Sequence, residues 1–93
     1  MIKSFCDAET VKVFDRRFSR RQPNDIQSVA LRKLRMLNNA VDLADLRSPP
    51  SSRLEKLSGG RSGQYSVRIN DQWRICFAWR GGDAHDVEIC DYH

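Results

Sequence analysis

Residues 61–79 read RSGQYSVRINDQWRICFAW, and this stretch decides the fold of the 93-residue chain. Apolar side chains alternate with other residues on both sides of a polar insert, Asn70-Asp71-Gln72. The alternating residues are Tyr65, Val67 and Ile69 before the insert and Trp73, Ile75, Phe77 and Trp79 after it. Alternation with a period of two is typical of a strand with one buried face, and the insert suits a short turn. The stretch therefore predicts an antiparallel hairpin.

The register of this hairpin sets two arginines against each other. If Ile69 pairs with Trp73 on the buried face, Arg68 pairs with Arg74 on the other face. Like charges directly opposite each other are destabilising unless an anion or a carboxylate lies between them. Two interpretations stay open from the spacing alone: a solvated basic face with splayed side chains, or a cradle for phosphate.

The composition is that of one small domain with a basic surface. Sixteen Lys and Arg against twelve Asp and Glu give a net charge of +4, and Arg suits phosphate because its planar fork grips two oxygens. No apolar run approaches the ~20 residues of a membrane span, and the N-terminus does not resemble a signal peptide. We expect a single domain over residues 1–93, located in the cytoplasm and away from membranes.

Three cysteines, Cys6, Cys76 and Cys90, are an odd number without CxxC spacing, so we expect free thiols and no metal site. A glycine-rich nucleotide loop, zinc-ligand spacing and a GxSxG elbow are also missing from the sequence. The sequence therefore predicts no cofactor.

Two helices are expected before the hairpin. Residues 2–6 alternate and predict a short first strand, and Asp7 then suits the N-cap of a helix. The residues of this helix expected to face the core are Val11, Phe14 and Phe18. A second helix, capped by Asn24 or Asp25, is expected to run to about Asn39. Its apolar stripe consists of Ile26, Ala30, Leu34, Leu37 and Val41. Leu31 falls outside the stripe and is a candidate partner surface.

Further strands are expected on both sides of the hairpin: residues 53–57 before the Gly59-Gly60 turn, and residues 85–92 after Gly81-Gly82. The order of elements predicts an α+β fold with two N-terminal helices packed on one face of a small antiparallel sheet. The opposite face, which carries Arg68, Arg74 and Cys76, is then expected to be open to a ligand such as RNA.

A cluster of basic residues lies between the two expected helices, at Arg16, Arg17, Arg20 and Arg21. Two interpretations stay open here as well: a solvated basic loop, or a segment that grips a nucleic-acid backbone.

Residues suited to acid–base chemistry lie near the hairpin and at the C-terminus: Glu55, Arg74, Asp91, Tyr92 and His93. Metal-free RNA cleavage needs a base for the 2′-OH proton, a cation for the charged phosphorane and an acid for the leaving 5′ oxygen. Only RNA offers the 2′-OH as an internal nucleophile. From residue types alone, this chemistry is one possibility among several.

Nearly the whole chain resembles the HigB branch (host inhibition of growth) of the RelE/ParE toxin superfamily. The stretches that carry the resemblance are MIKSF at 1–5, DLRSPP at 45–50, RLE at 53–55, GQ at 63–64, NDQWRICF at 70–77 and DYH at 91–93. The resemblance implies the toxin of a type II toxin–antitoxin system, a ribosome-dependent endoribonuclease that cuts mRNA in the A site of the 30S subunit. It also implies a HigA-type helix-turn-helix antitoxin, through which alone the toxin reaches operator DNA.

The resemblance also implies roles by position. Arg74 matches the phosphate-binding arginine of the family, and Asp91, Tyr92 and His93 match its C-terminal catalytic set. Some HigB relatives carry a catalytic His where this chain has Glu55 and a Lys three residues later, at Ser58. Sister ribosome-dependent toxins use a Glu as general base at that place, so Glu55 can fill the role. Arg68 and the arginines at 16–21 would then contact RNA.

Two alternatives belong to other functional classes. One is a ParE-like gyrase-inhibiting toxin, which shares the fold but lacks the terminal acid–base set, so the Tyr92-His93 ending argues against it. The other is a catalytically weak module that binds RNA or the antitoxin.

Overall fold

The computed structural model describes residues 1–20, 23–47, 50–61 and 63–91. Its helices and strands are α1 (Ala8–Phe14), α2 (Gln27–Asn39), β1 (Glu55–Lys56), β2 (Gln64–Arg68), β3 (Trp73–Arg80) and β4 (Asp83–Asp91). Short 3-10 turns connect them: η1 (Asn24–Ile26), η2 (Leu43–Arg47), η3 (Pro50–Ser52) and η4 (Gly59–Arg61). None of the described helices has the length and apolar character that a bilayer crossing requires.

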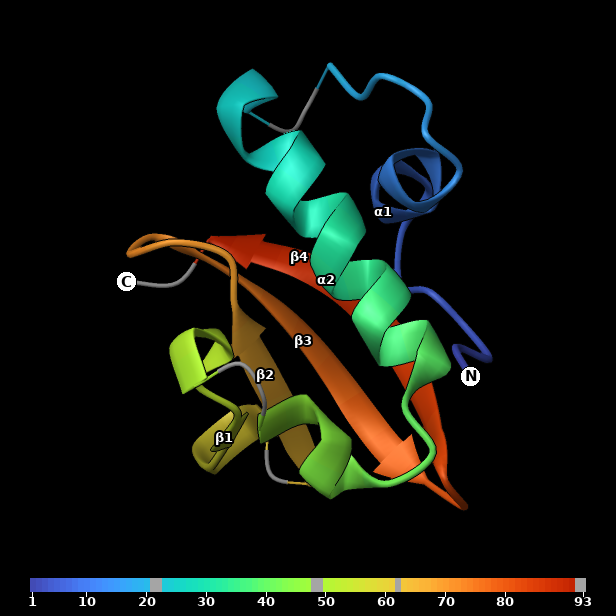
Figure 1. Ribbon diagram of the computed structural model, residues 1–93, viewed down its shortest axis with the longest axis vertical. Helices are drawn as coiled ribbons and strands as arrows, with labels where there is room; N and C mark the ends of the chain where they lie inside the picture. The colour runs from blue at the N-terminus through green and yellow to red at the C-terminus, as the bar shows by residue number, and fades with distance from the viewer. Residues whose placement is uncertain (21–22, 48–49, 62, 92–93) are drawn as a thin grey trace.

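The four strands form one antiparallel sheet in the order β1-β2-β3-β4 (Figure 1), which confirms the predicted α+β class. The register of the central hairpin is also as predicted. Val67 lies opposite Ile75 and Arg68 lies opposite Arg74. The amide of Ile69 donates to the carbonyl of Trp73 at 2.9 Å and closes the turn.

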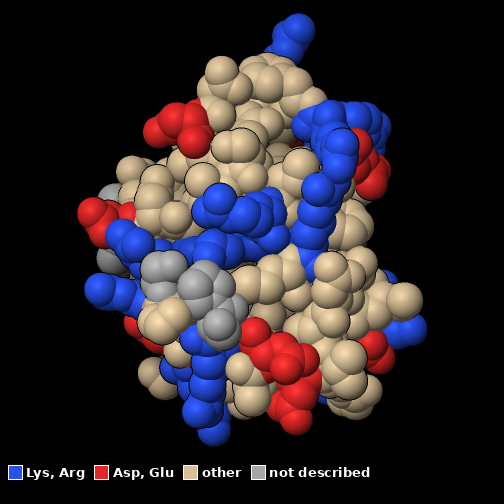
Figure 2. Space-filling model, viewed as in Figure 1, with Lys and Arg blue, Asp and Glu red and all other residues tan. Residues whose placement is uncertain are grey.

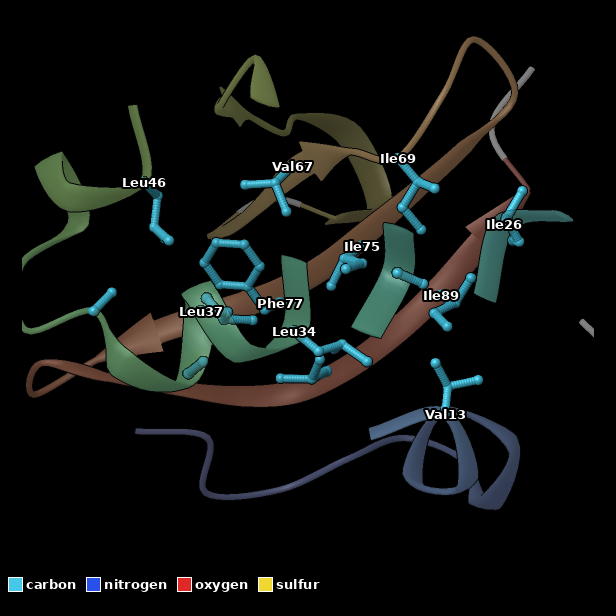
Figure 3. Close-up of a cluster of buried hydrophobic side chains, with 14 residues drawn as sticks. Val13, Ile26, Leu34, Leu37, Leu46, Val67, Ile69, Ile75, Phe77 and Ile89 are labelled. Carbon is cyan, nitrogen blue, oxygen red and sulfur yellow. The ribbon is translucent and has the colours of Figure 1, made fainter. Parts of the chain in front are cut away.

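The core lies between α2 and the sheet. Figure 1 shows α2 lying across β3 and β4, and the close-up in Figure 3 shows its side chains meeting those of the strands. The fully buried side chains from the two layers include Ala30, Leu34 and Leu37 of α2 and Val67, Ile75, Phe77 and Val87 of the strands. Alternation in the strands and a helical stripe in α2 thus supply the two halves of one apolar interior.

Two predicted core residues are wrong, because the helices end earlier than the apolar pattern suggests. Phe18 is 64% exposed and Val41 is 80% exposed. The first helix ends at Phe14, and Arg16 already has a positive φ of 62°. The second helix ends at Asn39, and Ala40 has an extended ψ of 132° that takes the following residue out of helical phase. Val13 supplies the buried contact of α1 instead.

The N-terminal segment pairs with β4 more loosely than a regular strand. Residues 2–6 make two isolated parallel bridges, Ile2 with Ala84 and Phe5 with Val87. Between the bridges, Asp86 has a positive φ of 54°, and its amide donates to the Ser4 hydroxyl at 2.9 Å. This interruption prevents a continuous ladder, so the predicted first strand is present only as an edge contact. The last strand begins at Asp83, two residues before its predicted start.

Candidate active site

The candidate site is centred on Arg74 of β3 and Glu55 of the edge strand β1. Glu55 lies opposite Ser66, Ser66 lies opposite Cys76, and Arg74 is two residues from Cys76 along the strand. Directly paired residues and residues two apart share one face of a sheet. Glu55, Ser66 and Arg74 are therefore on the same face, and an oxygen of Glu55 lies 3.8 Å from Nη2 of Arg74.

The guanidinium of Arg74 is held by hydrogen bonds from two of its nitrogens. Nε donates to the hydroxyl of Ser66 at 2.7 Å, and Nη2 donates to the backbone carbonyl of Arg53 at 2.7 Å. A longer contact of 3.4 Å joins Nη2 to the Ser66 carbonyl. Since a guanidinium is planar, bonds from Nε and Nη2 fix the orientation of the whole group.

The expectation that this face of the sheet is open is wrong at its centre. Arg74 is only 7% exposed and Cys76 only 1% exposed. The chain at Arg53 passes close enough for its carbonyl to reach Arg74, and Arg61 of η4 reaches Glu88 of β4 at 2.7 Å. These segments bury the middle of the face. Glu55 is different, since 52% of its side chain is exposed, so the solvent-facing part of the site is at the β1 edge.

Arg68 and Arg74 are directly opposite each other, as predicted, and each has its own acceptors. Arg68 forms an ion pair with Asp71 in the hairpin turn, while Arg74 turns toward Ser66 and Arg53. The two guanidinium groups thus point to different partners. This arrangement explains how the sheet accommodates two like charges in adjacent strands.

Asp91 is not on the face that carries Arg74. It lies opposite Trp73, whereas Arg74 lies opposite Cys90, and neighbouring positions of a strand point to opposite faces. One carboxylate oxygen of Asp91 accepts a hydrogen bond of 3.1 Å from the amide of Gln72. Tyr92 and His93, the other members of the predicted C-terminal set, are outside the described residues.

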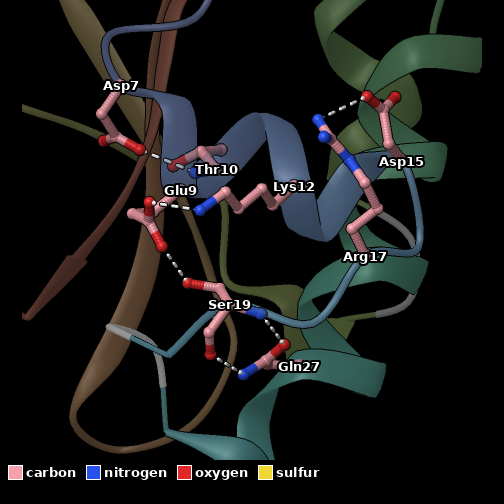
Figure 4. Close-up of polar contacts among 8 residues, drawn as sticks. All are labelled: Asp7, Glu9, Thr10, Lys12, Asp15, Arg17, Ser19 and Gln27. Carbon is pink, nitrogen blue, oxygen red and sulfur yellow. Dashed lines mark hydrogen bonds and ion pairs between the residues drawn. The ribbon is translucent and has the colours of Figure 1, made fainter.

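The basic segment between α1 and α2 is anchored by a network around Ser19 (Figure 4). The Ser19 hydroxyl donates to Glu9 at 2.6 Å, and the Gln27 side chain makes two hydrogen bonds with the Ser19 backbone, at 2.8 and 3.2 Å. Arg16, Arg17 and Arg20 are exposed, and Arg17 pairs with Asp15 at 3.3 Å. Arg21 is outside the described residues. In Figure 1 the described part of this segment arches over the top of the view, whereas β1 is at the lower left, so the segment lies away from β1.

All three cysteines are free thiols, as predicted. Cys76 and Cys90 are on the same face of the sheet as Arg74. The hydrogen bond between their thiols is the main cause that raises the pKa of Cys90, and burial raises it further. Among the described residues, no group of three or more His, Cys, Asp or Glu side chains is placed to hold a metal ion.

Sequence reasoning missed two groups that hold Arg74. Ser66 had a usable signal, because it is two residues before Arg68 in an alternating strand and therefore shares its face. The carbonyl of Arg53 had none. Arg53 adopts a positive φ of 45°, which is uncommon outside glycine, and a backbone oxygen leaves no mark in the sequence.

Comparison with known proteins assigns this chain to a family. The family model described as the RelE-like toxin of the type II toxin–antitoxin system HigB matches residues 3–93. Toxin HigB-1 of Vibrio cholerae is 42% identical over 62 residues, which is 67% of this chain and 65%, just under two thirds, of that protein. Endoribonuclease HigB of Proteus vulgaris is 30% identical over 94 residues and is matched over the full length of both chains.

Solved structures show the same fold at lower identity. The YoeB-YefM toxin–antitoxin complex of Staphylococcus aureus contains a chain that is 22% identical to this one, with a TM-score of 0.61. The match covers 100% of this chain and 98% of that chain, so the likeness extends over the whole fold. Taken with the family match over residues 3–93, it shows that this chain belongs to the HigB-like family of RelE-like toxins of type II toxin–antitoxin systems.

Proposed function

We propose that this toxin is a ribosome-dependent endoribonuclease that cuts mRNA without a metal ion and so stops translation and growth. The observation that carries the proposal is the pairing of Arg74 with the exposed carboxylate of Glu55, 3.8 Å away. Arg74 is buried and is held by hydrogen bonds to Ser66 and Arg53. Full-length similarity to a protein named Endoribonuclease HigB supports the class of reaction. We also propose that residues 1–93 act as one domain in the cytoplasm, where translating ribosomes are found.

In this mechanism Glu55 is the general base. It takes the proton from a ribose 2′-OH, and the 2′ oxygen attacks the adjacent phosphorus. The bond from phosphorus to the 5′ oxygen then breaks, which leaves a 2′,3′-cyclic phosphate on one fragment and a 5′-hydroxyl on the other. Arg74 stabilises the extra negative charge on the phosphorane, and because its guanidinium is already oriented, little reorganisation is needed as the charge develops.

The leaving 5′ oxygen needs a proton, and we assign this step to His93 on the resemblance to the family. Tyr92 is proposed to complete the C-terminal set. Asp91 lies on the other face of β4, so we propose that it positions the two residues that follow it and does not contact the phosphate.

RNA binding is proposed to use both layers of the molecule. We assign α1 and α2 to one face of the sheet and the phosphate chemistry to the other, with Arg68 beside Arg74. The exposed Arg16, Arg17 and Arg20, together with Arg21, are proposed to dock on ribosomal RNA. Figure 2 supports a basic docking surface, since Lys and Arg side chains extend across the face that α2 presents.

A helix-turn-helix antitoxin of the HigA type is the proposed protein partner. The family match to a toxin–antitoxin system supports an antitoxin, and a related fold is solved together with one. Contact with operator DNA would then be made by the antitoxin.

The test is single-turnover cleavage on ribosomes programmed with a defined mRNA. Arg74→Ala is expected to slow A-site cleavage by about 100-fold or more, the effect of losing one oxyanion donor. Arg74→Lys should recover little, because the fork is lost. Glu55→Gln should lower the rate by about 10²-fold or more through loss of the base. Arg80→Ala, at the exposed far end of the same strand, is the control and should cleave normally.

The stability of each variant is measured together with its cleavage rate, because Arg74 is buried. Its removal leaves hydrogen-bond acceptors without a donor and is expected to lower the free energy of unfolding by about 1–3 kcal/mol. Glu55→Gln replaces a largely exposed side chain and keeps the test decisive if Arg74→Ala melts. Normal cleavage by folded Arg74→Ala and Glu55→Gln would contradict the mechanism. The absence of A-site cuts by the wild type would favour a gyrase inhibitor or a binding module.

A further inference from the structure

A basic hollow of about 520 Å3 lies beside β1, on the opposite face of the sheet from Glu55. Lys56 lies opposite Tyr65, and both are one position out of phase with the Glu55–Ser66 pair, which places them on the other face. The side chains that matter for its chemistry are Leu43, Arg47, Arg53, Leu54, Lys56 and Tyr65. Among the described residues that line it there are three cations and no Asp or Glu.

The lining suits a nucleotide better than a simple anion. Arg47, Arg53 and Lys56 supply positive charge for phosphate, and Leu43 and Leu54 supply apolar surface. Tyr65 adds an aromatic ring that is already fixed, because it stacks on buried Phe77 with centroids 6.2 Å apart and planes 28° apart. Bases of single-stranded RNA bind by stacking on such rings while cations hold the backbone. In Figure 2, Lys and Arg side chains also lie at the lower left, beside a group of Asp and Glu side chains at the lower centre.

The hollow is connected to the candidate site through the backbone of one residue. Arg53 lines the hollow, and its backbone carbonyl accepts the 2.7 Å hydrogen bond from Arg74. Lys56 follows Glu55 directly, about 3.3 Å along the strand. Because β1 is the edge of the sheet, a strand of RNA that passed over this edge would meet Glu55 on one face and Lys56 on the other.

We propose that this hollow is a second RNA subsite, which binds a nucleotide adjacent to the scissile phosphate and holds the strand across β1. Phosphate is bound by Arg47, Arg53 and Lys56, and the base lies against Tyr65. The inference rests on the proposed function, because RNA is the ligand of both sites. Continuity with the Arg74–Glu55 pair favours RNA as the occupant, because a substrate strand has to extend past the scissile phosphate and so has to contact surface next to the site.

The test compares two double variants that lose the same charge. Arg47→Gln with Lys56→Gln removes two cations of the hollow. Lys3→Gln with Arg80→Gln removes two exposed cations at the β3–β4 end of the molecule and is the matched control. A mixed-sequence single-stranded RNA of ten nucleotides is titrated into each protein at several salt concentrations, and amide shifts are followed by NMR. A third variant, Tyr65→Leu, removes the ring, with Tyr65→Phe as its conservative partner.

In the wild type, the amides of Leu54, Lys56 and Tyr65 are expected to shift on addition of RNA. The hollow variant should lower the slope of log affinity against log salt by about 1.4, since each lost phosphate contact on single-stranded nucleic acid is worth about 0.7. The control should keep most of its affinity for RNA. Tyr65→Leu should weaken binding about 10-fold, while Tyr65→Phe should bind nearly as well as the wild type.

Equal salt slopes for the hollow variant and the wild type would overturn the proposal, as would RNA-induced shifts confined to other regions. Loss of antitoxin affinity in the hollow variant, with RNA binding intact, would overturn it too and identify a protein-binding site. Cleavage on ribosomes is measured separately. RNA binding in the hollow without any mRNA cleavage by the wild type would refute the proposed function, and the hollow would then be an RNA-binding site without a role in cleavage.

Discussion

At the scale of single residues, Ser66 links the orientation of Arg74 to the sheet. Its hydroxyl accepts from Nε of Arg74 at 2.7 Å, and the residue is fully buried in the middle of β2. A side chain that holds a charged group in a buried position affects both the stability of the protein and the geometry of the site. In the proposed mechanism Ser66 is therefore a positioning residue, since it would act on the phosphate through Arg74.

Ser66→Ala is expected to lower the free energy of unfolding by about 1–3 kcal/mol, because a buried charged donor loses its acceptor. Cleavage should fall about 10-fold through kcat, with little change in KM, since a misplaced guanidinium weakens the transition state more than binding. Ser66→Thr keeps the hydroxyl and should recover most of the rate. Single-turnover rates and urea unfolding of the three proteins test this. A Thr variant as slow as the Ala variant would show that the hydroxyl itself is unimportant.

At the scale of secondary-structure elements, strands were easier to predict than helix ends. Alternation in residues 65–79 fixed the hairpin, its register and its buried face, because the side-chain period of a strand leaves one consistent choice. In both helices the apolar stripe predicts more residues than the helix contains. Phe18 and Val41 continue the apolar spacing, yet the backbone leaves the helix at Asp15 and Ala40. Backbone conformation at a helix end depends on local capping, which hydrophobic spacing does not record.

The same contrast applies to the site. Glu55 and Arg74 were predicted as members of one acid–base set and lie 3.8 Å apart, but the burial of Arg74 depends on Arg53, which is 21 residues away in the chain. Contacts of that kind have no local signal. The position of Asp91 could have been predicted, because Val87, Ile89 and Asp91 are two residues apart and alternation places all three on one face.

Lys33 joins two elements, and it makes stability depend on pH. Its amine, on α2, donates to the Ser52 hydroxyl of η3 at 2.5 Å in a buried position. Burial lowers the pKa of Lys33, and the nearby Arg32 and Arg68 lower it further. The unfolded chain then binds the proton more tightly than the folded protein. Stability therefore rises with pH between the lowered pKa and the usual value of about 10.4.

Lys33→Met removes this contribution. The difference in the free energy of unfolding between the wild type and Lys33→Met is expected to shift in favour of the wild type from pH 7 toward pH 10. Groups that titrate in both proteins cancel in this difference. Urea unfolding at a series of pH values measures the difference. A constant difference across that range would mean that Lys33 keeps its ordinary pKa in the folded protein.

At the scale of the whole molecule, basic groups occur in separate places: the α1–α2 connection, the surface of α2 and the region of β1. Several basic patches on a chain of 93 residues suit an RNA partner larger than a single mRNA strand. Docking on the ribosome would hold the mRNA in place and supply the alignment that one small site cannot.

Cleavage is accordingly expected to need the ribosome. Naked mRNA should be cut at least about 10²-fold more slowly than the same mRNA in the A site. Holding two reactants in the correct orientation lowers the activation free energy of a bimolecular reaction by several kcal/mol. Parallel time courses with free and ribosome-bound transcript measure the ratio. Efficient, codon-selective cleavage of free mRNA at low enzyme concentration would show that the protein positions its substrate alone.

The pairing of the N-terminal segment with β4 has a consequence for how the toxin is made. Ser4 and Asp86 are bonded across 82 residues of chain, and β4 is synthesised after every other described element. Contacts between residues so far apart in the sequence form late in folding, because the entropic cost of closing a long loop must be overcome first. A nascent chain therefore has no partner for its first residues and no final strand beside β3. We expect the growing polypeptide to stay inactive until β4 has been translated, so that the ribosome producing the toxin is not its first target.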